Sequence, residues 1–116
     1  MIITEDYVSF EIAKLLKEKG FNEDSWFHYD ADGDIVTRGY RLNMPEDIPA
    51  WTLQMAMKWL REVHDVIVNV FYNKDEERWC AEHYRMLIDD YTLIGYYNTY
   101  EQACEAAIRY CLENLI

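Results

Sequence analysis

Cys80 and His83 stand three residues apart, a C-x-x-H spacing that suggests a metal site. The residues around them read as a β-strand, and residues three apart on a strand point to opposite faces. One metal ion therefore cannot take both side chains without a bulge. A cysteine nucleophile activated by His64 or His83 would be marked by a glycine-flanked elbow or an oxyanion motif, and neither occurs. We expect no catalytic residue, no metal site and no enzyme activity.

The other two cysteines, Cys104 and Cys111, fall on one face of an expected helix. They are about 10 Å apart along its axis, which is too far for a disulfide. Three cysteines is also an odd number, unlike the disulfide framework of a secreted domain. The cysteine content therefore favours a cytoplasmic protein.

Asp30, Asp32 and Asp34 alternate in the way that a calcium-binding loop begins. An EF-hand needs glycine at its sixth position and an acidic residue at its twelfth. Counted from Asp30, those positions hold Ile35 and Arg41. Asp and Gly are also the residues that a tight hairpin turn prefers. We read the segment as a turn and expect no cofactor; whether the three aspartates bind a cation stays open.

The periodicity of apolar residues and the turn residues between them predict eight elements. Their order is α-β-β-α-β-β-β-α, and the short polar turns between sequential strands require antiparallel pairing. We therefore predict one α+β domain over residues 1–116, an antiparallel sheet with three helices packed on it. The expected bounds are Glu5–Lys19, Trp26–Asp30, Asp34–Leu42, Thr52–His64, Val66–Tyr72, Arg78–Ile88, Thr92–Tyr97 and a last helix behind Thr99.

Both ends of the first expected helix carry local signals. Thr4 can cap its N-terminus, and Gly20 can take the left-handed position just after its C-terminus. Phe21 can then pack back on Leu16. In the last helix, Thr99 and Gln102 have the spacing of a capping box. Asn43–Ala50, which holds both prolines, is the one expected linker or long loop.

A weak repeat accompanies this order. Ala13 and Tyr29 recur at one common offset as Ala56 and Tyr72, so each half of the chain reads as one α-β-β unit. The identities are too few to decide between duplication and chance. A superposition of the two units would separate the alternatives.

Length and charge exclude several classes of protein. The chain has 116 residues with 22 acidic and 11 basic side chains, a net charge of −11. Nucleic acids and anionic membranes are bound mainly through Lys and Arg, so neither is an expected partner. No stretch approaches the roughly 18–20 apolar residues that span a bilayer. The N-terminal residues have no basic and apolar regions of the kind that make a signal peptide.

The order α-β-β-β-α after Thr52 is also that of a double-stranded-RNA-binding domain. That module needs basic residues at the start of its last helix, where this chain has Asn98-Thr-Tyr-Glu-Gln. We therefore do not expect RNA binding. The acidic charge leaves a converse alternative open, an acidic inhibitor or nucleic-acid mimic encoded by a phage or mobile element.

The leading candidate site is a ridge on the second expected helix. Trp51, Met55 and Trp59 repeat every four residues on the side opposite the apolar face that would enter the core. Large aromatic and Met side chains with few charges between them are typical of an interface core. We therefore predict a non-enzymatic protein–protein interaction module that binds another chain, or itself as a homodimer, through this ridge.

Three segments resemble a family of small proteins of gut anaerobic bacteria and their phages or mobile elements, for which no function is known. They are Glu5–Phe21, Thr52–His64 and Tyr97–Ile116, in the same order. The resemblance implies a bacterial or phage origin and a cytoplasmic setting. It assigns no functional residue.

Overall fold

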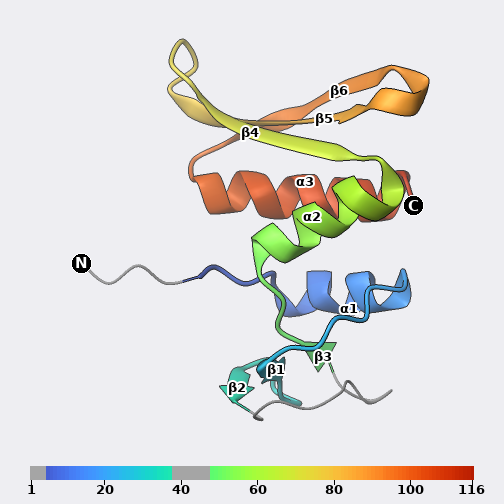
Figure 1. Cartoon of the computed structure of the whole chain (residues 1–116). Coiled ribbons are helices and arrows are strands. Elements are labelled where there is room, and N and C mark those ends of the chain that lie inside the picture. The colour runs from blue at the N-terminus through green and yellow to red at the C-terminus, as the bar shows by residue number, and fades with distance from the viewer. Residues whose placement is uncertain (1–4, 38–47) are drawn as a thin grey trace. The chain divides into compact units, whose positions relative to one another are not determined.

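The computed structural model describes residues 5–37 and 48–116, which divide into two compact units, Met1–Thr52 and Leu53–Ile116 (Figure 1). These residues form three α-helices, a short 3-10 helix and two antiparallel three-stranded sheets. The α+β class and the predicted order of elements are confirmed, with two sheets in place of one and an additional two-residue strand. Each unit is described by itself below, and a single domain over the whole chain stays a prediction.

Helix α1 (Phe10–Glu18) of the first unit begins later than the sequence predicted. Its N-cap is Ser9, whose hydroxyl accepts a hydrogen bond from the backbone N–H of Ile12 at 3.3 Å. The expected start at Glu5 is therefore wrong, and the expected cap Thr4 lies outside the described residues.

The late start of α1 has a tertiary cause. Tyr7 forms an antiparallel β-bridge with Thr52, and the N–H of Val8 donates to the carbonyl of Trp51 at 2.9 Å. These two pairings hold residues 7 and 8 in an extended backbone. Helix α1 can therefore begin only after residue 8.

The end of α1 follows the local signals. Gly20 has φ +101°, and its N–H donates to the carbonyl of Lys17 at 3.1 Å. The N–H of Phe21 donates to the carbonyl of Leu16 at 3.0 Å, and the Phe21 side chain is buried. These two bonds make a complete Schellman motif, as predicted.

The sheet of the first unit has the order β2-β1-β3, with both pairings antiparallel. The second expected strand, Asp34–Leu42, is described only as far as residue 37, and residues 43–47 of the expected linker also lie outside the described part. The last part of that linker is a short strand. The strand bounds are β1 (Phe27–Tyr29), β2 (Ile35–Thr37) and β3 (Ile48–Pro49).

The core of the first unit includes buried residues of α1, β1 and β3 and of the segments next to them. The hydroxyl of Tyr29 donates to the carbonyl of Val8, and the Phe10 ring stacks on Tyr29 with centroids 5.3 Å apart. The helix and the sheet are thereby joined through aromatic side chains. The buried residues include Val8, Ile12, Leu16, Phe21, His28, Tyr29 and Trp51.

The second unit has the order α-β-β-β-α around one sheet, β4-β5-β6, in which neighbouring strands are antiparallel. The expected core face of its first helix is confirmed, with Leu53, Ala56, Met57 and Leu60 all buried. Its elements are α2 (Leu53–His64), β4 (Ile67–Asn73), β5 (Arg78–Arg85), the 3-10 helix η1 (Met86–Ile88), β6 (Asp90–Tyr97) and α3 (Tyr100–Asn114).

The expected strand Arg78–Ile88 is too long by three residues, because its last part turns into η1. The turn is closed by Asp89, whose φ of 49° is left-handed. A carboxylate oxygen of Asp65 also accepts a hydrogen bond from the Leu87 N–H at 2.9 Å. The apolar residues of η1 continue the sequence pattern of the strand, which is why the prediction was too long. The left-handed backbone of Asp89 and the hydrogen bond from Leu87 to Asp65 belong to a turn instead.

The bulge expected at Gly95 is present. Ala81 pairs with Gly95 while the next residue, Glu82, pairs with Leu93, so one residue of β6 is extra. That residue, Ile94, packs with the core beneath the sheet. The bulge shifts the alternation of β6 by one position.

Both helices of the second unit cover the same face of its sheet. Helix α3 packs against all three strands, while α2 packs against β4 and α3 (Figure 1). The expected cap of α3 is confirmed in part, since Thr99 Oγ1 accepts from the Gln102 N–H at 3.1 Å. No helix within residues 5–37 and 48–116 is long and apolar enough to cross a membrane.

Candidate functional site

Trp51, the first residue of the expected ridge, is part of the core of the first unit. It is 0% exposed, its ring lies 4.6 Å from that of Phe21, and its Nε1–H donates to the carbonyl of Glu23 at 2.9 Å. It also precedes α2 in an extended segment. An aromatic ring whose N–H has found a buried partner stabilises the interior, so the prediction of Trp51 on an exposed ridge is wrong.

Met55 and Trp59, the other two members of that ridge, lie on α2 and are partly exposed. The Trp59 ring contacts His64 edge-to-face at 4.5 Å. Since Trp51 belongs to the first unit, the three residues do not form one ridge on one helix. A binding role for Met55 and Trp59 stays a prediction.

Asp30, Asp32 and Asp34 each place one carboxylate oxygen within 4.8 Å of the others. Asp30 Oδ1 accepts from the N–H of Asp32 at 2.9 Å and from that of Asp34 at 3.0 Å. These bonds close the β1–β2 hairpin in the way an aspartate closes a turn. The turn accounts for the cluster.

Cys80 and His83 lie on opposite faces of β5, as the strand period predicted. His83 points under the sheet, where its ring stacks on Tyr110 of α3 with centroids 5.5 Å apart. Burial raises the pKa of the Cys80 thiol, and the charge of Glu82 raises it further. Burial also raises the pKa of Cys111 to about 12. Thiols of this kind are poor nucleophiles at neutral pH.

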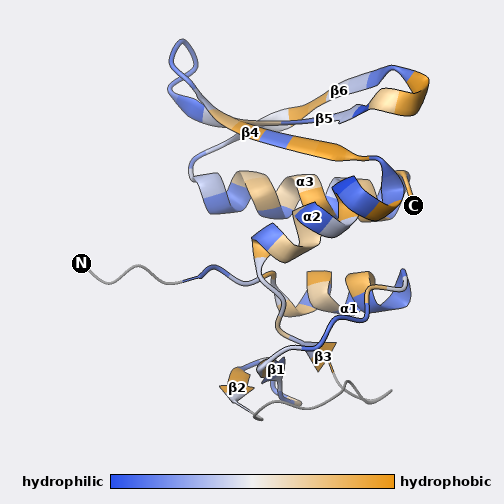
Figure 2. Ribbon diagram, in the orientation of Figure 1, coloured by the Kyte–Doolittle hydropathy of each residue, from blue (hydrophilic) through white to orange (hydrophobic). Residues whose placement is uncertain are grey.

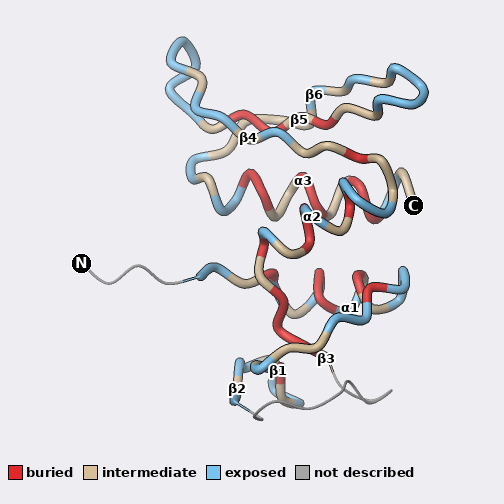
Figure 3. Tube along the Cα trace, viewed as in Figure 1, coloured by how far each residue is buried: buried red, intermediate tan, exposed pale blue. Residues whose placement is uncertain are grey.

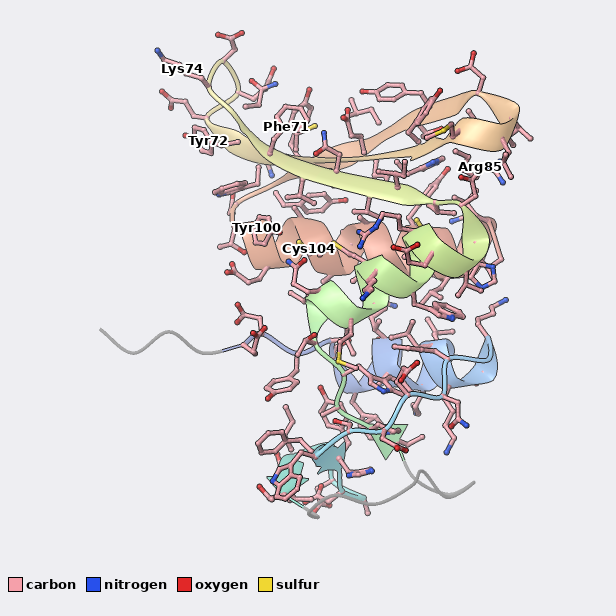
Figure 4. The ribbon with its side chains drawn as sticks, in the orientation of Figure 1. Phe71, Tyr72, Lys74, Arg85, Tyr100 and Cys104 are labelled. Carbon is pink, nitrogen blue, oxygen red and sulfur yellow. The ribbon has the colours of Figure 1, made fainter. Side chains whose placement is uncertain are left out.

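The outer face of the β4-β5-β6 sheet is covered by no described element of its own unit. It carries three rows of paired residues, which we call the open face: Phe71–Cys80–Tyr96, Asn69–Glu82–Leu93 and Ile67–Tyr84–Tyr91. Figure 4 shows Phe71 on the side of β4 away from α3. Seven of the nine residues are aromatic, aliphatic or cysteine. A sheet face exposed to water normally alternates to polar residues, so this composition is unusual.

Several side chains of the open face are exposed to solvent, whereas the Cys80 thiol is buried. Tyr91 is 58% exposed, Leu93 45% and Phe71 38%. Cys80 is only 2% exposed, because it stands between the larger rings of Phe71 and Tyr96 in its row. Figure 3 shows how much of β4 and β6 is exposed or half-buried.

The 3-10 helix η1 extends this apolar surface at the end of the β5–β6 hairpin (Figure 2). Its three residues are apolar and exposed, and Leu87 is 85% exposed. With the side chains above, they expose on the order of 600 Å² of apolar surface, the upper end of the range for a monomer.

Glu82 lies at the centre of the open face. Its Oε1 accepts a hydrogen bond from Asn69 Nδ2 at 2.8 Å, and its Oε2 accepts one from the Tyr91 hydroxyl. Both donors are neutral, and no cation of the described residues is paired with this carboxylate. The charge at the middle of the face is therefore uncompensated.

The sequence contained a signal for this surface. The alternation of β4 puts Val68 and Val70 on one face but also Ile67 and Phe71 on the other. A strand with apolar residues on both faces needs two covering layers, whereas both helices of this unit cover the same face.

The chain matches no family model, no curated protein and no solved structure. The resemblance of its three segments to a family of gut bacteria and phages stays a prediction, and the candidate site depends on geometry alone.

Proposed function

We propose that the chain acts by binding another protein through the open face and the adjoining η1. The observation that supports this is a sheet face with seven apolar or aromatic positions of nine, uncovered within its own unit. The exposed Tyr91, Phe71 and Leu93 supply the large contact area that interface cores use.

This proposal moves the binding surface from α2 to the sheet. Trp51 is fully buried, and Trp59 has one ring edge against His64, so α2 offers less apolar surface than the sequence suggested. A nucleic-acid mimic would instead present rows of carboxylates. The open face has one acidic residue among nine, which favours protein binding over that alternative.

Affinity capture with matched variants tests the proposal. The full chain carrying Leu93→Asp, Trp59→Asp or Val63→Asp is compared with the unsubstituted chain, using lysate of the source cells and identification by mass spectrometry. Leu93 lies on the open face, while Val63 is an exposed apolar residue of α2. We expect Leu93→Asp alone to lose the captured partner, because it places a charge inside the apolar contact.

Circular dichroism and urea unfolding accompany each variant, so that loss of binding is not confused with loss of fold. The free energy of unfolding of the Leu93→Asp chain is expected to fall by about 1 kcal/mol, because the new carboxylate lies directly opposite Glu82 on the neighbouring strand. Capture that survives Leu93→Asp but is lost with Trp59→Asp would return the site to α2. Capture that survives both would contradict protein binding through either surface.

A further inference from the structure

We propose that the partner segment bound by the open face is basic as well as apolar, and that it places a lysine or arginine on Glu82. This inference depends on the proposed function, because it names the chemistry of the partner at that same site. The residues that carry it are Glu82 and its two neutral donors, Asn69 and Tyr91.

Any partner that covers the open face must contact the Glu82 carboxylate. The register places it in the middle row and on the middle strand of the open face, between Asn69 and Leu93. Apolar and aromatic residues fill the rows on either side. A partner that covers Phe71, Leu93 and Tyr91 together must therefore also cover the Glu82 carboxylate.

Covering that carboxylate with apolar groups alone is unfavourable. An ionised group removed from water needs a charged partner or several hydrogen bonds, and the two neutral donors supply only part of this. A guanidinium or ammonium group from the partner supplies the missing charge and strengthens the contact. The face is also already arranged to receive a cation, because both Glu82 oxygens are held in place by their donors.

The rest of the chain favours the same partner. The nine residues of the open face include no lysine or arginine, and the chain as a whole has a net charge of −11. A basic segment is therefore attracted over a distance as well as at the contact. A second copy of the chain brings the same negative charge and the same uncompensated glutamate, so it is the less suitable occupant.

The exposed apolar area agrees with binding a single segment. It is on the order of 600 Å², below the roughly 800 Å² that each partner contributes to a standard interface. An apolar contact of this size gains affinity and specificity from one well-placed ion pair at its centre.

Peptide selection tests this chemistry directly. A phage-displayed library of random peptides is selected on the immobilised full-length chain, and the enriched peptides are synthesised for affinity measurements. The variants compared are Glu82→Gln, Leu93→Asp and Glu101→Gln. Glu101 is an exposed residue of α3, so Glu101→Gln removes the same charge away from the open face.

The expected peptides combine Lys or Arg with large apolar residues. Their dissociation constants should rise about ten-fold or more with Glu82→Gln, which corresponds to the loss of one desolvated ion pair. Glu101→Gln should change them by less than about two-fold, because exposed charges interact weakly. Leu93→Asp should abolish binding.

The outcomes separate the two proposals. Peptides that need Leu93 but bind the Glu82→Gln chain unchanged, or that lack basic residues, would overturn this inference and leave protein binding by the face intact. Absence of any enriched peptide that needs Leu93 would overturn this inference, whereas the proposed function is decided by the capture experiment with Leu93→Asp. A stable dimer that Leu93→Asp dissociates would show that a second copy occupies the face, which also overturns the inference.

Discussion

His83 is completely buried beneath the sheet of the second unit, yet neither of its ring nitrogens has a hydrogen-bond partner among the described residues. Burial lowers the pKa of His83; the charge of Asp90 opposes this shift and that of Arg85 adds to it. The folded chain therefore holds the neutral imidazole, while the unfolded chain binds a proton near the ordinary value of 6.5.

This difference predicts a loss of stability in mild acid. Since the folded-state pKa is the lower one, the contribution of His83 is fully present above pH 6.5 and declines as the pH falls below it. The substitution His83→Met, of similar volume, should remove that part of the pH dependence. It should also raise the free energy of unfolding at neutral pH by about 1 kcal/mol, because it removes unsatisfied buried polar atoms.

Urea unfolding of both chains at a series of pH values between neutral and about pH 5 measures this effect. The difference between the two chains isolates His83 from every other titrating group. An unchanged slope of stability against pH in the His83→Met chain would contradict the prediction.

The spacing of residues along the sequence does not place Trp51 correctly. Trp51, Met55 and Trp59 have the spacing of a helical stripe, but the helix begins only at Leu53. The Nε1–H bond of Trp51 to the Glu23 carbonyl joins residues far apart in the chain. Spacing along the sequence contains no information on such a contact.

Among the elements, the C-terminal end of α1 depends on the left-handed backbone of a single residue, Gly20. Gly20 has φ +101°, and no atom lies within 4 Å of the position where a Cβ would be. Gly20→Ala should therefore lower the free energy of unfolding by about 1–2 kcal/mol through backbone strain alone, without any steric clash. Urea unfolding followed by circular dichroism measures the loss.

Gly20→Asn is the graded control for this prediction. Asparagine tolerates a left-handed backbone better than alanine does, so its loss of stability should be clearly smaller. If the two variants lowered the free energy of unfolding equally, the loss would come from the presence of a side chain and not from the left-handed backbone.

The two ends of α1 explain why one helix boundary was predicted and the other was not. The Schellman motif depends on residues 16–21, all of which are neighbours in the sequence. The start depends on Tyr7 and Val8 pairing with Thr52 and Trp51, more than forty residues later. Similarly, the end of β5 depends on Asp65 reaching the Leu87 N–H from before β4.

For the whole molecule, the uncompensated charge of Glu82 and the net charge of −11 lead to one expectation about self-association. The isolated chain should be a monomer of 14.0 kDa at both low and high salt. At low salt the like charges repel, and at high salt two copies still have to bury their glutamates. Size-exclusion chromatography with light scattering measures the mass.

A monomer at low salt that becomes a dimer at high salt would show that repulsion between chains, and not the glutamate at the centre of the face, prevents pairing. A dimer in both conditions would contradict the expectation outright. Repeating the measurement with Leu93→Asp identifies whether the open face is the surface involved.

The class and order of the elements were predicted from alternation, caps and turns, all of which act over short distances. The open face was not, because its nature depends on which side of the sheet the helices cover. Apolar residues on both sides of β4 are compatible with either side being buried. The packing of α2 and α3 on one side leaves Phe71 and its neighbours uncovered by the described elements of their own unit.

The bridge between Tyr7 and Thr52 has a consequence for synthesis on the ribosome. It joins residues 7 and 52, and the strands and helix described for the first unit all lie in the part of the chain that is made before the second unit. Translation at about 5–20 residues per second leaves this unit seconds to close before the second is complete. The nascent first half thus has time to bury His28 and Trp51 before the apolar strands of the second half emerge.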